Sequence, residues 1–298
     1  MTKPKVIAVV GPTASGKTSL SIELAKKYNG EVISADSRQV YRGMDLGTGK
    51  VTTDEMDGVP HHLLDICDPM DVYTGADFAR DGAAALQDIL KRGRTPIVAG
   101  GSFFYLDLLR GKSTSAPVEP DETFRESLGN LSNATLMEML LEKDSVRAAT
   151  IDTHNRRRLI RALEIIHTLG NVPLPTETES PYEWLILGID IEKEILHDTI
   201  YRRLISRLKS GMIVEARNLH GAGVNYQRME DIGLEYRYLA RHLQGELSES
   251  EMTEVLNTKI RQFAKRQLTW LKRDEEIEWF APQNREAILR RVSDFLAE

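Results

Sequence analysis

The fold class is first indicated by one segment near the N-terminus, Val6-Ile7-Ala8-Val9-Val10-Gly11-Pro12-Thr13-Ala14-Ser15-Gly16-Lys17-Thr18. Residues 6–10 are an apolar run typical of a buried strand, and residues 17–27 space their apolar positions for a helix. The residues between them satisfy the pattern G-x-x-x-x-G-K-[ST], which occurs where a strand turns into a helix. Because the flanking elements are right, a chance glycine-rich turn is disfavoured, and we predict a phosphate-binding loop (P-loop).

Each part of this loop suits a phosphorylated ligand. Glycines allow backbone amides to converge on a phosphate, and the helix N-terminus adds partial positive charge. Lys17 supplies a full positive charge, and the Thr18 hydroxyl is a predicted ligand of Mg²⁺. The predicted phosphate-binding residues are Gly11, Pro12, Thr13, Ala14, Ser15, Gly16, Lys17 and Thr18.

The rest of the chain predicts an α/β fold: a P-loop NTPase-like parallel sheet with flanking helices and an inserted all-helical domain. Further strands are predicted at residues 31–35, 95–99 and 184–189. Further helices are predicted at residues 75–92, 193–209 and 248–273, the last opening with the capping-box spacing of Ser248 and Glu251. Residues 113–182 are polar and helical, with prolines near both ends. We therefore predict a core of residues 1–112 and 183–298 and an insertion of residues 113–182.

Composition argues against several classes of protein. The 298 residues contain no apolar stretch long enough to cross a bilayer, and no secretory signal precedes the first strand. The single cysteine, Cys67, permits no internal disulfide and no Cys-rich zinc cluster, and we expect a buried inert thiol. A net charge of −6 argues against a protein that coats nucleic acid non-specifically. We expect a cytoplasmic monomer that does not bind membranes.

The motif leaves the identity of the phosphorylated ligand open. Most P-loops bind ATP or GTP, with an acidic residue at the end of a neighbouring strand that helps to hold the metal. Residues 95–101 end without an acid, whereas Asp36 follows the second predicted strand. Strand ends in such sheets face the ligand crevice, so Asp36 is predicted to accept a proton or contact the metal. The alternative is that Asp36 only caps the following turn.

Two basic stretches stand out against the acidic background. Arg156, Arg157, Arg158 and Arg161 form one, and residues 255–273 form the other, with six basic residues and no acid. From charge alone, solvated helix faces are the simpler interpretation.

At this point the sequence resembles the tRNA dimethylallyltransferase (tRNA isopentenyltransferase) family over almost its whole length. After the P-loop, the resemblance is carried by Asp36-Ser37-Arg38-Gln39-Val40-Tyr41, His61-His62-Leu63, Arg158-Leu159-Ile160-Arg161-Ala162-Leu163-Glu164 and Ala264-Lys265-Arg266-Gln267-Leu268-Thr269-Trp270. The resemblance implies that the P-loop binds dimethylallyl diphosphate with Mg²⁺. It also implies transfer of the dimethylallyl group to N6 of adenosine 37, beside the anticodon in the anticodon stem-loop of tRNA.

The resemblance also implies roles for individual residues. Asp36 matches the catalytic aspartate, Ser102 keeps a hydroxyl of the family's G-G-T-G motif, and Arg203 has the spacing of an arginine directed to the pyrophosphate. The segment of Asp36, Ser37, Arg38 and Gln39 matches one that touches the target nucleotide. A second tRNA-contacting segment matches Arg157, Arg158, Leu159, Ile160 and Arg161. For the helix that carries Lys265, Arg266 and Gln267, roles in the core, the pyrophosphate site or the RNA site stay open.

Some positions depart from the family pattern. Phe103 replaces a glycine and is expected to reshape the adenine entrance or the prenyl pocket. Gly233-Leu234-Glu235-Tyr236 stands where Gly-Tyr-Lys-Glu is usual, and Phe263 stands where tyrosine is common. Without zinc-ligand spacing after the core, a bacterial-type enzyme is expected. His61 and His62 lack the helical spacing of a metal pair, so we expect them to be structural.

Three alternatives remain at this point. A small-molecule kinase or ATPase would use the same loop, and it would turn over ATP. A non-catalytic RNA-binding protein would have no physical reason to keep Lys17, Thr18 and Asp36 together. A prenyltransferase acting on free adenosine phosphate is disfavoured by the helical insertion and by Arg158 and Arg161.

Overall fold

The computed structural model describes residues 2–114, 116–173 and 178–298. The chain divides into two compact units. The larger one comprises Met1–Arg110 and Glu179–Glu298, and the smaller one comprises Gly111–Thr178. The insertion was expected at residues 113–182.

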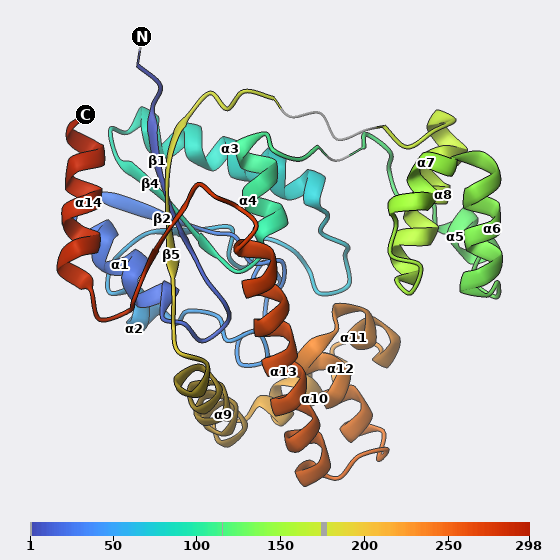
Figure 1. Cartoon of the computed structure of the whole chain (residues 1–298). Coiled ribbons are helices and arrows are strands. Elements are labelled where there is room, and N and C mark those ends of the chain that lie inside the picture. The colour runs from blue at the N-terminus through green and yellow to red at the C-terminus, as the bar shows by residue number, and fades with distance from the viewer. Residues whose placement is uncertain (1, 115, 174–177) are drawn as a thin grey trace. The chain divides into compact units, whose positions relative to one another are not determined.

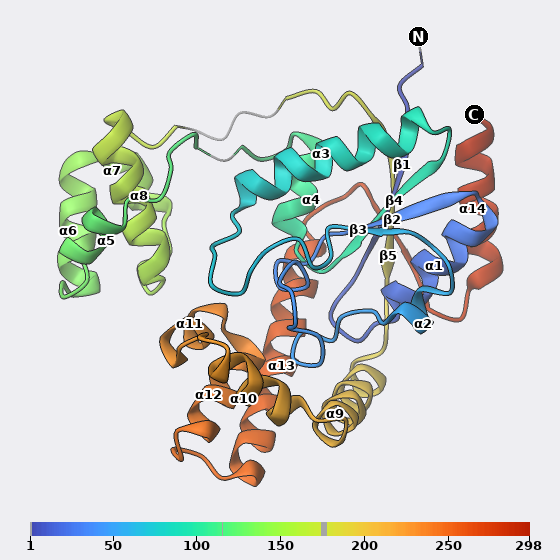
Figure 2. The same ribbon diagram turned by 180° about the vertical axis from the view of Figure 1, so that it is seen from behind.

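The described part of the larger unit is built on a six-stranded sheet in the order β3-β2-β4-β1-β5-β6, with every pairing parallel. Figures 1 and 2 show this sheet from its two sides. The strands are β1 (Lys5–Val10), β2 (Gly30–Ser34), β3 (His61–His62), β4 (Thr95–Gly100), β5 (Glu183–Ile189) and β6 (Ile277–Phe280). The predicted parallel α/β class is confirmed, whereas β3 and β6 had not been predicted.

Both faces of the sheet are buried, as expected of a parallel sheet. On one face, Ile7 and Val9 of β1 pack with α1 (Lys17–Lys27) and α14 (Arg285–Ala297). On the other face, Val6, Ala8 and Val10 pack with α3 (Gly75–Lys91), α4 (Phe103–Arg110) and the end of α13. The alternation of β1 side chains thus joins two cores through one strand.

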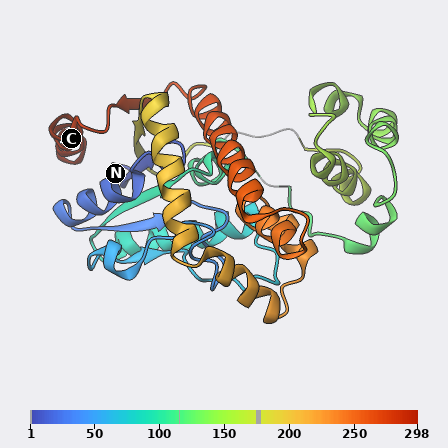
Figure 3. The same ribbon diagram turned by 90° about the horizontal axis from the view of Figure 1, so that it is seen from below.

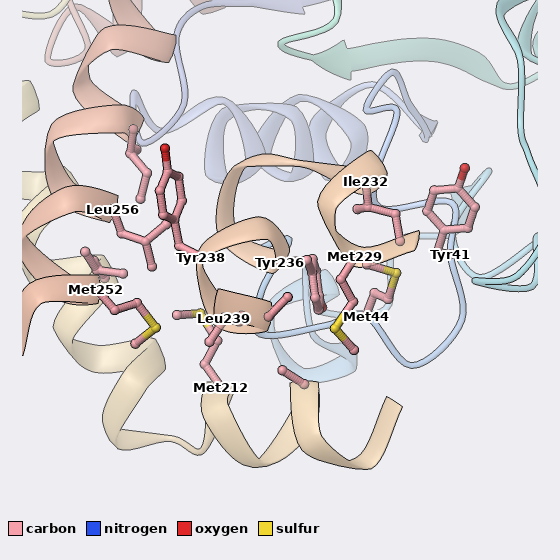
Figure 4. Packing of buried hydrophobic residues seen from close by; sticks show 14 of the residues in the cluster. Tyr41, Met44, Met212, Met229, Ile232, Tyr236, Tyr238, Leu239, Met252 and Leu256 are labelled. Atoms are coloured by element: carbon pink, nitrogen blue, oxygen red, sulfur yellow. The ribbon is translucent and has the colours of Figure 1, made fainter. Parts of the chain in front are cut away.

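A second group of helices packs at one end of this unit around α13 (Glu249–Leu271). It consists of α9 (Lys193–Lys209), α10 (Met212–Gly221), α11 (Tyr226–Ile232) and α12 (Leu234–Leu243). Figure 3 shows α9 and α13 side by side. The core of this group includes Met44, Met212, Met229 and Met252 (Figure 4). The capping box predicted at Ser248 and Glu251 is confirmed, although α13 ends at Leu271, two residues earlier than expected.

The smaller unit contains α5 (Glu122–Ser127), α6 (Asn133–Lys143), α7 (Ser145–Thr150) and α8 (Arg156–Leu169). The helices begin at side-chain caps, which include Asp121, Ser132 and Asn155. Leu136, Leu140 and Leu159 form the centre of its own core. The helical character predicted for the insertion is confirmed. In the larger unit, the short helix α2 (Thr53–Met56) also begins with a capping box.

Candidate active site

The P-loop connects the end of β1 with the first turn of α1. Gly16 has φ +91°, a conformation that favours glycine, and no side chain caps α1. The first amides of a helix have no acceptor within the helix, so they remain available to an anion. Nearby, the buried Ser15 hydroxyl has no hydrogen-bond partner among the residues that the structure describes. Buried polar groups are normally satisfied, so this loop fits a bound anion.

Lys17 provides the positive charge of the loop. Its Nζ donates a hydrogen bond to the carbonyl oxygen of Pro12 at 2.6 Å. Burial lowers the pKa of Lys17 from 10.5 to about 8, with Asp36 opposing the shift and Arg203 adding to it. A bound phosphate would favour the charged form and reverse the effect of burial.

One cavity in the larger unit joins the P-loop to the ends of β2 and β4. It holds about 830 Å³ of empty space when the solvent at its open mouth is included. Its lining residues are Thr13, Ala14, Lys17, Thr18, Ser34, Asp36, Ser37, Arg38, Gln39, Thr48, Gly49, Ala99, Gly100, Gly101, Ser102, Arg203, Leu234, Glu235, Phe263 and Gln267. The cavity therefore brings together every predicted catalytic residue and the predicted Mg²⁺ ligand.

Asp36 and Ser102 lie at neighbouring strand ends. Asp36 Oδ1 accepts a hydrogen bond from the amide of Arg38 at 2.9 Å, so the proposed turn-capping role is real. Its Oδ2 accepts no hydrogen bond from the described residues and is open to a ligand. The Ser102 hydroxyl accepts a hydrogen bond from the amide of Ser37 at 3.3 Å, which ties β4 to the Asp36 segment.

Arg203 enters the cavity from α9. The residue is exposed overall, and its partial desolvation together with the nearby charge of Arg207 lowers its pKa. Arg203 Nη2 lies 3.4 Å from the position that a Cβ on Gly49 would take, so the loop backbone passes close to this guanidinium. Arg203 and Lys17 thus form the positively charged side of the cavity.

Gln267 is a site residue whose role the sequence left open. Its side chain is 5% exposed and bridges two loops. Oε1 accepts a hydrogen bond from the amide of Thr13 at 2.8 Å, and Nε2 donates to the carbonyl of Gly101 at 2.9 Å. An added Cβ on Gly101 would collide with this amide, which explains the glycine. Gln267 therefore fixes the P-loop against the segment that carries Ser102.

Phe103, His62 and Cys67 are not among the residues that line the cavity. Phe103 stacks on Trp270, with ring centroids 4.3 Å apart. This stacking places the ring against α13, and the expected effect of Phe103 on the adenine entrance or the prenyl pocket stays a prediction. His62 contacts Glu31 at 2.7 Å, consistent with the structural role expected for it. Cys67 is half-buried, and burial raises the pKa of its thiol.

The side chains of the basic segment in the smaller unit differ in their exposure to solvent. Arg157 and Arg158 are exposed on α8. Arg161 pairs with Glu164 and donates to the carbonyl of Val118 at 2.7 Å. Leu159 is 0% exposed and belongs to the core of this unit, so its side chain is not available for an RNA contact. Ile160 is partly buried against the same core, and Arg156, the neighbour of this segment, donates to the carbonyls of Leu128, Gly129 and Leu131.

The family model for IPP transferase matches residues 39–274. The chain belongs to the IPP transferase family. It is 40% identical to the tRNA dimethylallyltransferase of Halalkalibacterium halodurans over 288 residues, which cover 93% of this chain and 91% of that protein. It is 41% identical to tRNA dimethylallyltransferase 1 of Geotalea uraniireducens over 271 residues, which cover 91% and 89%.

Solved structures of the IPP transferase family are similar over the whole chain. The full-length tRNA isopentenylpyrophosphate transferase of Bacillus halodurans matches with a TM-score of 0.73 and 36% identity, covering 99% of this chain and 96% of that chain. A eukaryotic dimethylallyltransferase studied while acting on tRNA matches with a TM-score of 0.85 and 26% identity, covering 99% and 80%. Among the described helices, none is long and apolar enough to cross a membrane.

Proposed function

We propose that this chain transfers the dimethylallyl group of dimethylallyl diphosphate to N6 of the adenosine beside the anticodon in the anticodon stem-loop of tRNA. The observation that carries the proposal is one cavity that is lined by both the anion-binding loop and Asp36. Membership of the IPP transferase family and the names of its relatives point to the same reaction.

The chemistry asks for few groups. The bond between the allylic carbon and the diphosphate oxygen breaks, and a bond from N6 to that carbon forms. Backbone amides of the P-loop, Lys17 and Arg203 stabilise the negative charge that develops on the leaving diphosphate. Asp36 orients the adenine amino group and accepts its proton. The Ser102 hydroxyl helps to hold the Asp36 segment in place through the amide of Ser37.

The residues present fit a Mg²⁺ ion that completes its coordination with the substrate. Thr18 and Asp36 both line the cavity with oxygen-bearing side chains, and the described residues contain no group of three acidic, histidine or cysteine side chains that could hold a metal ion by themselves. Mg²⁺ is commonly held by one or two protein oxygens together with phosphate oxygens and water. We propose that Thr18 supplies the protein ligand, and that the ion, when bound, neutralises charge on the diphosphate.

The target RNA is proposed to contact two segments. Ser37, Arg38 and Gln39 line the cavity beside Asp36, where an adenine that has left its stack would bind. Arg157 and Arg158 are exposed cations at the start of α8 and would bind backbone phosphates. Since one chain supplies the whole cavity, we propose that a monomer is active.

The test is transfer of label from dimethylallyl diphosphate to unmodified tRNA in the presence of Mg²⁺, for the wild type and for Asp36→Asn. We expect label on the adenosine beside the anticodon with the wild type, and its loss by about 10²–10⁴-fold in the variant, the range of a general base. Pyrophosphate binding should survive in the variant because the P-loop is intact. Hydrolysis of ATP without any label transfer would instead support a kinase or ATPase.

A further inference from the structure

Residues 45–49, which we call the wall loop, form one side of the cavity without belonging to a strand or helix. Thr48 and Gly49 line the cavity directly. Glu215 of α10 holds the outer side of this loop. Its carboxylate accepts hydrogen bonds from the amides of Asp45 at 2.9 Å, Leu46 at 2.7 Å and Gly47 at 2.8 Å. Three consecutive backbone amides thus end on one side chain.

Tyr236 of α12 completes this arrangement. Its hydroxyl donates to Glu215 Oε1 at 2.6 Å, and its side chain is 1% exposed. Burial and the nearby carboxylate raise the pKa of Tyr236, so the hydroxyl keeps the proton that it donates. A Cβ on Gly47 would lie 2.5 Å from the Tyr236 ring, so the loop and the ring are in direct contact. A charged acceptor makes these hydrogen bonds stronger than neutral ones.

Arg207 of α9 binds the carbonyl groups of the same loop. Its Nη1 donates to the carbonyls of Leu46 at 3.2 Å and Gly47 at 3.1 Å, and its Nη2 donates to Glu235 at 3.3 Å. An anion therefore holds the amides of the wall loop and a cation holds its carbonyls. A loop fixed from both sides loses little entropy when substrate binds.

The inner side of the wall loop meets two proposed site residues. The carbonyl of Gly49 accepts a hydrogen bond from Gln39 Nε2 at 3.4 Å. A Cβ on Gly49 would also lie 3.3 Å from Nη1 of Arg207 and 3.4 Å from Nη2 of Arg203, so the Gly49 backbone runs close to both guanidinium groups. A displacement of the wall loop would therefore move groups on both the nucleotide side and the diphosphate side of the cavity.

We propose that Glu215, held by Tyr236, is a positioning residue for the transfer reaction: it fixes the wall loop and, through it, Gln39 and Arg203. This inference rests on the proposed function. Glu215 itself touches no substrate, so its effect appears in the rate of the bound complex. Small misplacements of reacting groups reduce rates strongly, by up to about 100-fold for a shift near 1 Å.

The decisive variant is Tyr236→Phe, which removes one hydroxyl and keeps the ring. Tyr238→Phe is a matched control, because Tyr238 lies on the same helix, is also buried and makes no hydrogen bond through its hydroxyl to any described residue. Figure 4 shows the two side chains leaving α12 in different directions, with Tyr236 near Met229 and Tyr238 near Leu256. Glu215→Gln tests the carboxylate itself.

Two measurements are made on each variant: hydrogen exchange of the amides of residues 45–47, and kcat for label transfer well below the melting temperature. We expect faster exchange and a kcat reduced about tenfold in Tyr236→Phe, with a loss nearer 100-fold in Glu215→Gln. Tyr238→Phe should match the wild type in both. If Glu215→Gln does not fold, Tyr236→Phe still decides the question.

A purely stabilising hydrogen bond would lower the melting temperature and leave kcat of the folded enzyme unchanged. The proposal is overturned if Tyr236→Phe leaves the hydrogen exchange of residues 45–47 unchanged, or if exchange becomes faster while kcat stays the same. It is also overturned if Tyr238→Phe loses as much kcat as Tyr236→Phe. The exchange measurement needs no turnover. A wild type that transfers no label would therefore refute the proposed function separately, while the exchange data would still report on the wall loop.

Discussion

Replacing Gln267 by leucine should damage both stability and activity. Leucine has a similar size and no polar group, so Gln267→Leu leaves the amide of Thr13 and the carbonyl of Gly101 without their side-chain partner. Gln267 is 5% exposed, Gly101 is buried and Thr13 is half-buried, so water can replace the lost hydrogen bonds only in part. Each unsatisfied buried group costs about 1–3 kcal/mol, so we expect a loss near 3 kcal/mol in the free energy of unfolding.

That loss corresponds to a fall of roughly 6–12 °C in the melting temperature of a domain of this size. The same change releases the P-loop from the segment that carries Ser102, so label transfer should fall by about 100-fold. Calorimetry gives the first value and single-turnover transfer gives the second.

Gln262→Leu is the matched control, because Gln262 is exposed on the same helix. It should stay within about 0.5 kcal/mol of the wild type. If Gln267→Leu melts with the wild type and transfers label at the wild-type rate, then the bridge between the two loops has no function, and the account of Gln267 given above is wrong.

Three further predictions follow from charged groups. The pKa of Lys17 is about 8, so this side chain loses its positive charge as pH rises through 8. The affinity of the wild type for pyrophosphate should then fall, whereas that of Lys17→Arg should not, and calorimetric titration at several pH values would measure both. In the unfolded chain Lys17 keeps its proton up to its ordinary pKa of 10.5, so this group makes the free energy of unfolding rise with pH between 8 and 10.5. A ratio of wild-type to Lys17→Arg affinity that does not change with pH would contradict the lowered pKa of Lys17. The hydrogen bond from Arg92 is the largest cause that lowers the pKa of Glu31 to about 2, so Glu31→Gln should cost roughly 2–3 kcal/mol at neutral pH. This difference should shrink as pH falls below 4.5 toward 2, and urea unfolding across that range would show whether it does. Arg158→Glu should weaken tRNA binding in a filter-binding assay and reduce the dependence of log affinity on log salt concentration by about 1. Arg161→Ala should mainly lower the melting temperature measured by calorimetry. The reverse pattern would mean that Arg161 binds the RNA and that Arg158 stabilises the fold.

The sequence predicted what short-range patterns control. The bounds of α1 and α9 agree with the predicted residues 17–27 and 193–209, because apolar spacing and helix-ending residues act within a few positions. The P-loop could also be predicted from the sequence, because its motif requires a strand directly before it and a helix directly after it in the chain. Asp36 could be placed near it because parallel strands end at one edge of a sheet. The two-residue strand β3 gave no such signal, because two residues show no periodicity.

Other features depend on residues that are far apart in the chain. Gln267 reaches Thr13 across 254 positions, and Tyr236 meets Glu215 only because α10 and α12 pack together. Leu159 lies within a basic segment that suggested an RNA contact, yet its side chain belongs to a hydrophobic core. The sequence by itself thus determined the fold class, the phosphate-binding loop and the carboxylate beside it, through local backbone and charge patterns. Only the tertiary structure decided which side chains hold that site together, because those contacts depend on the packing of whole helices against the sheet and against one another.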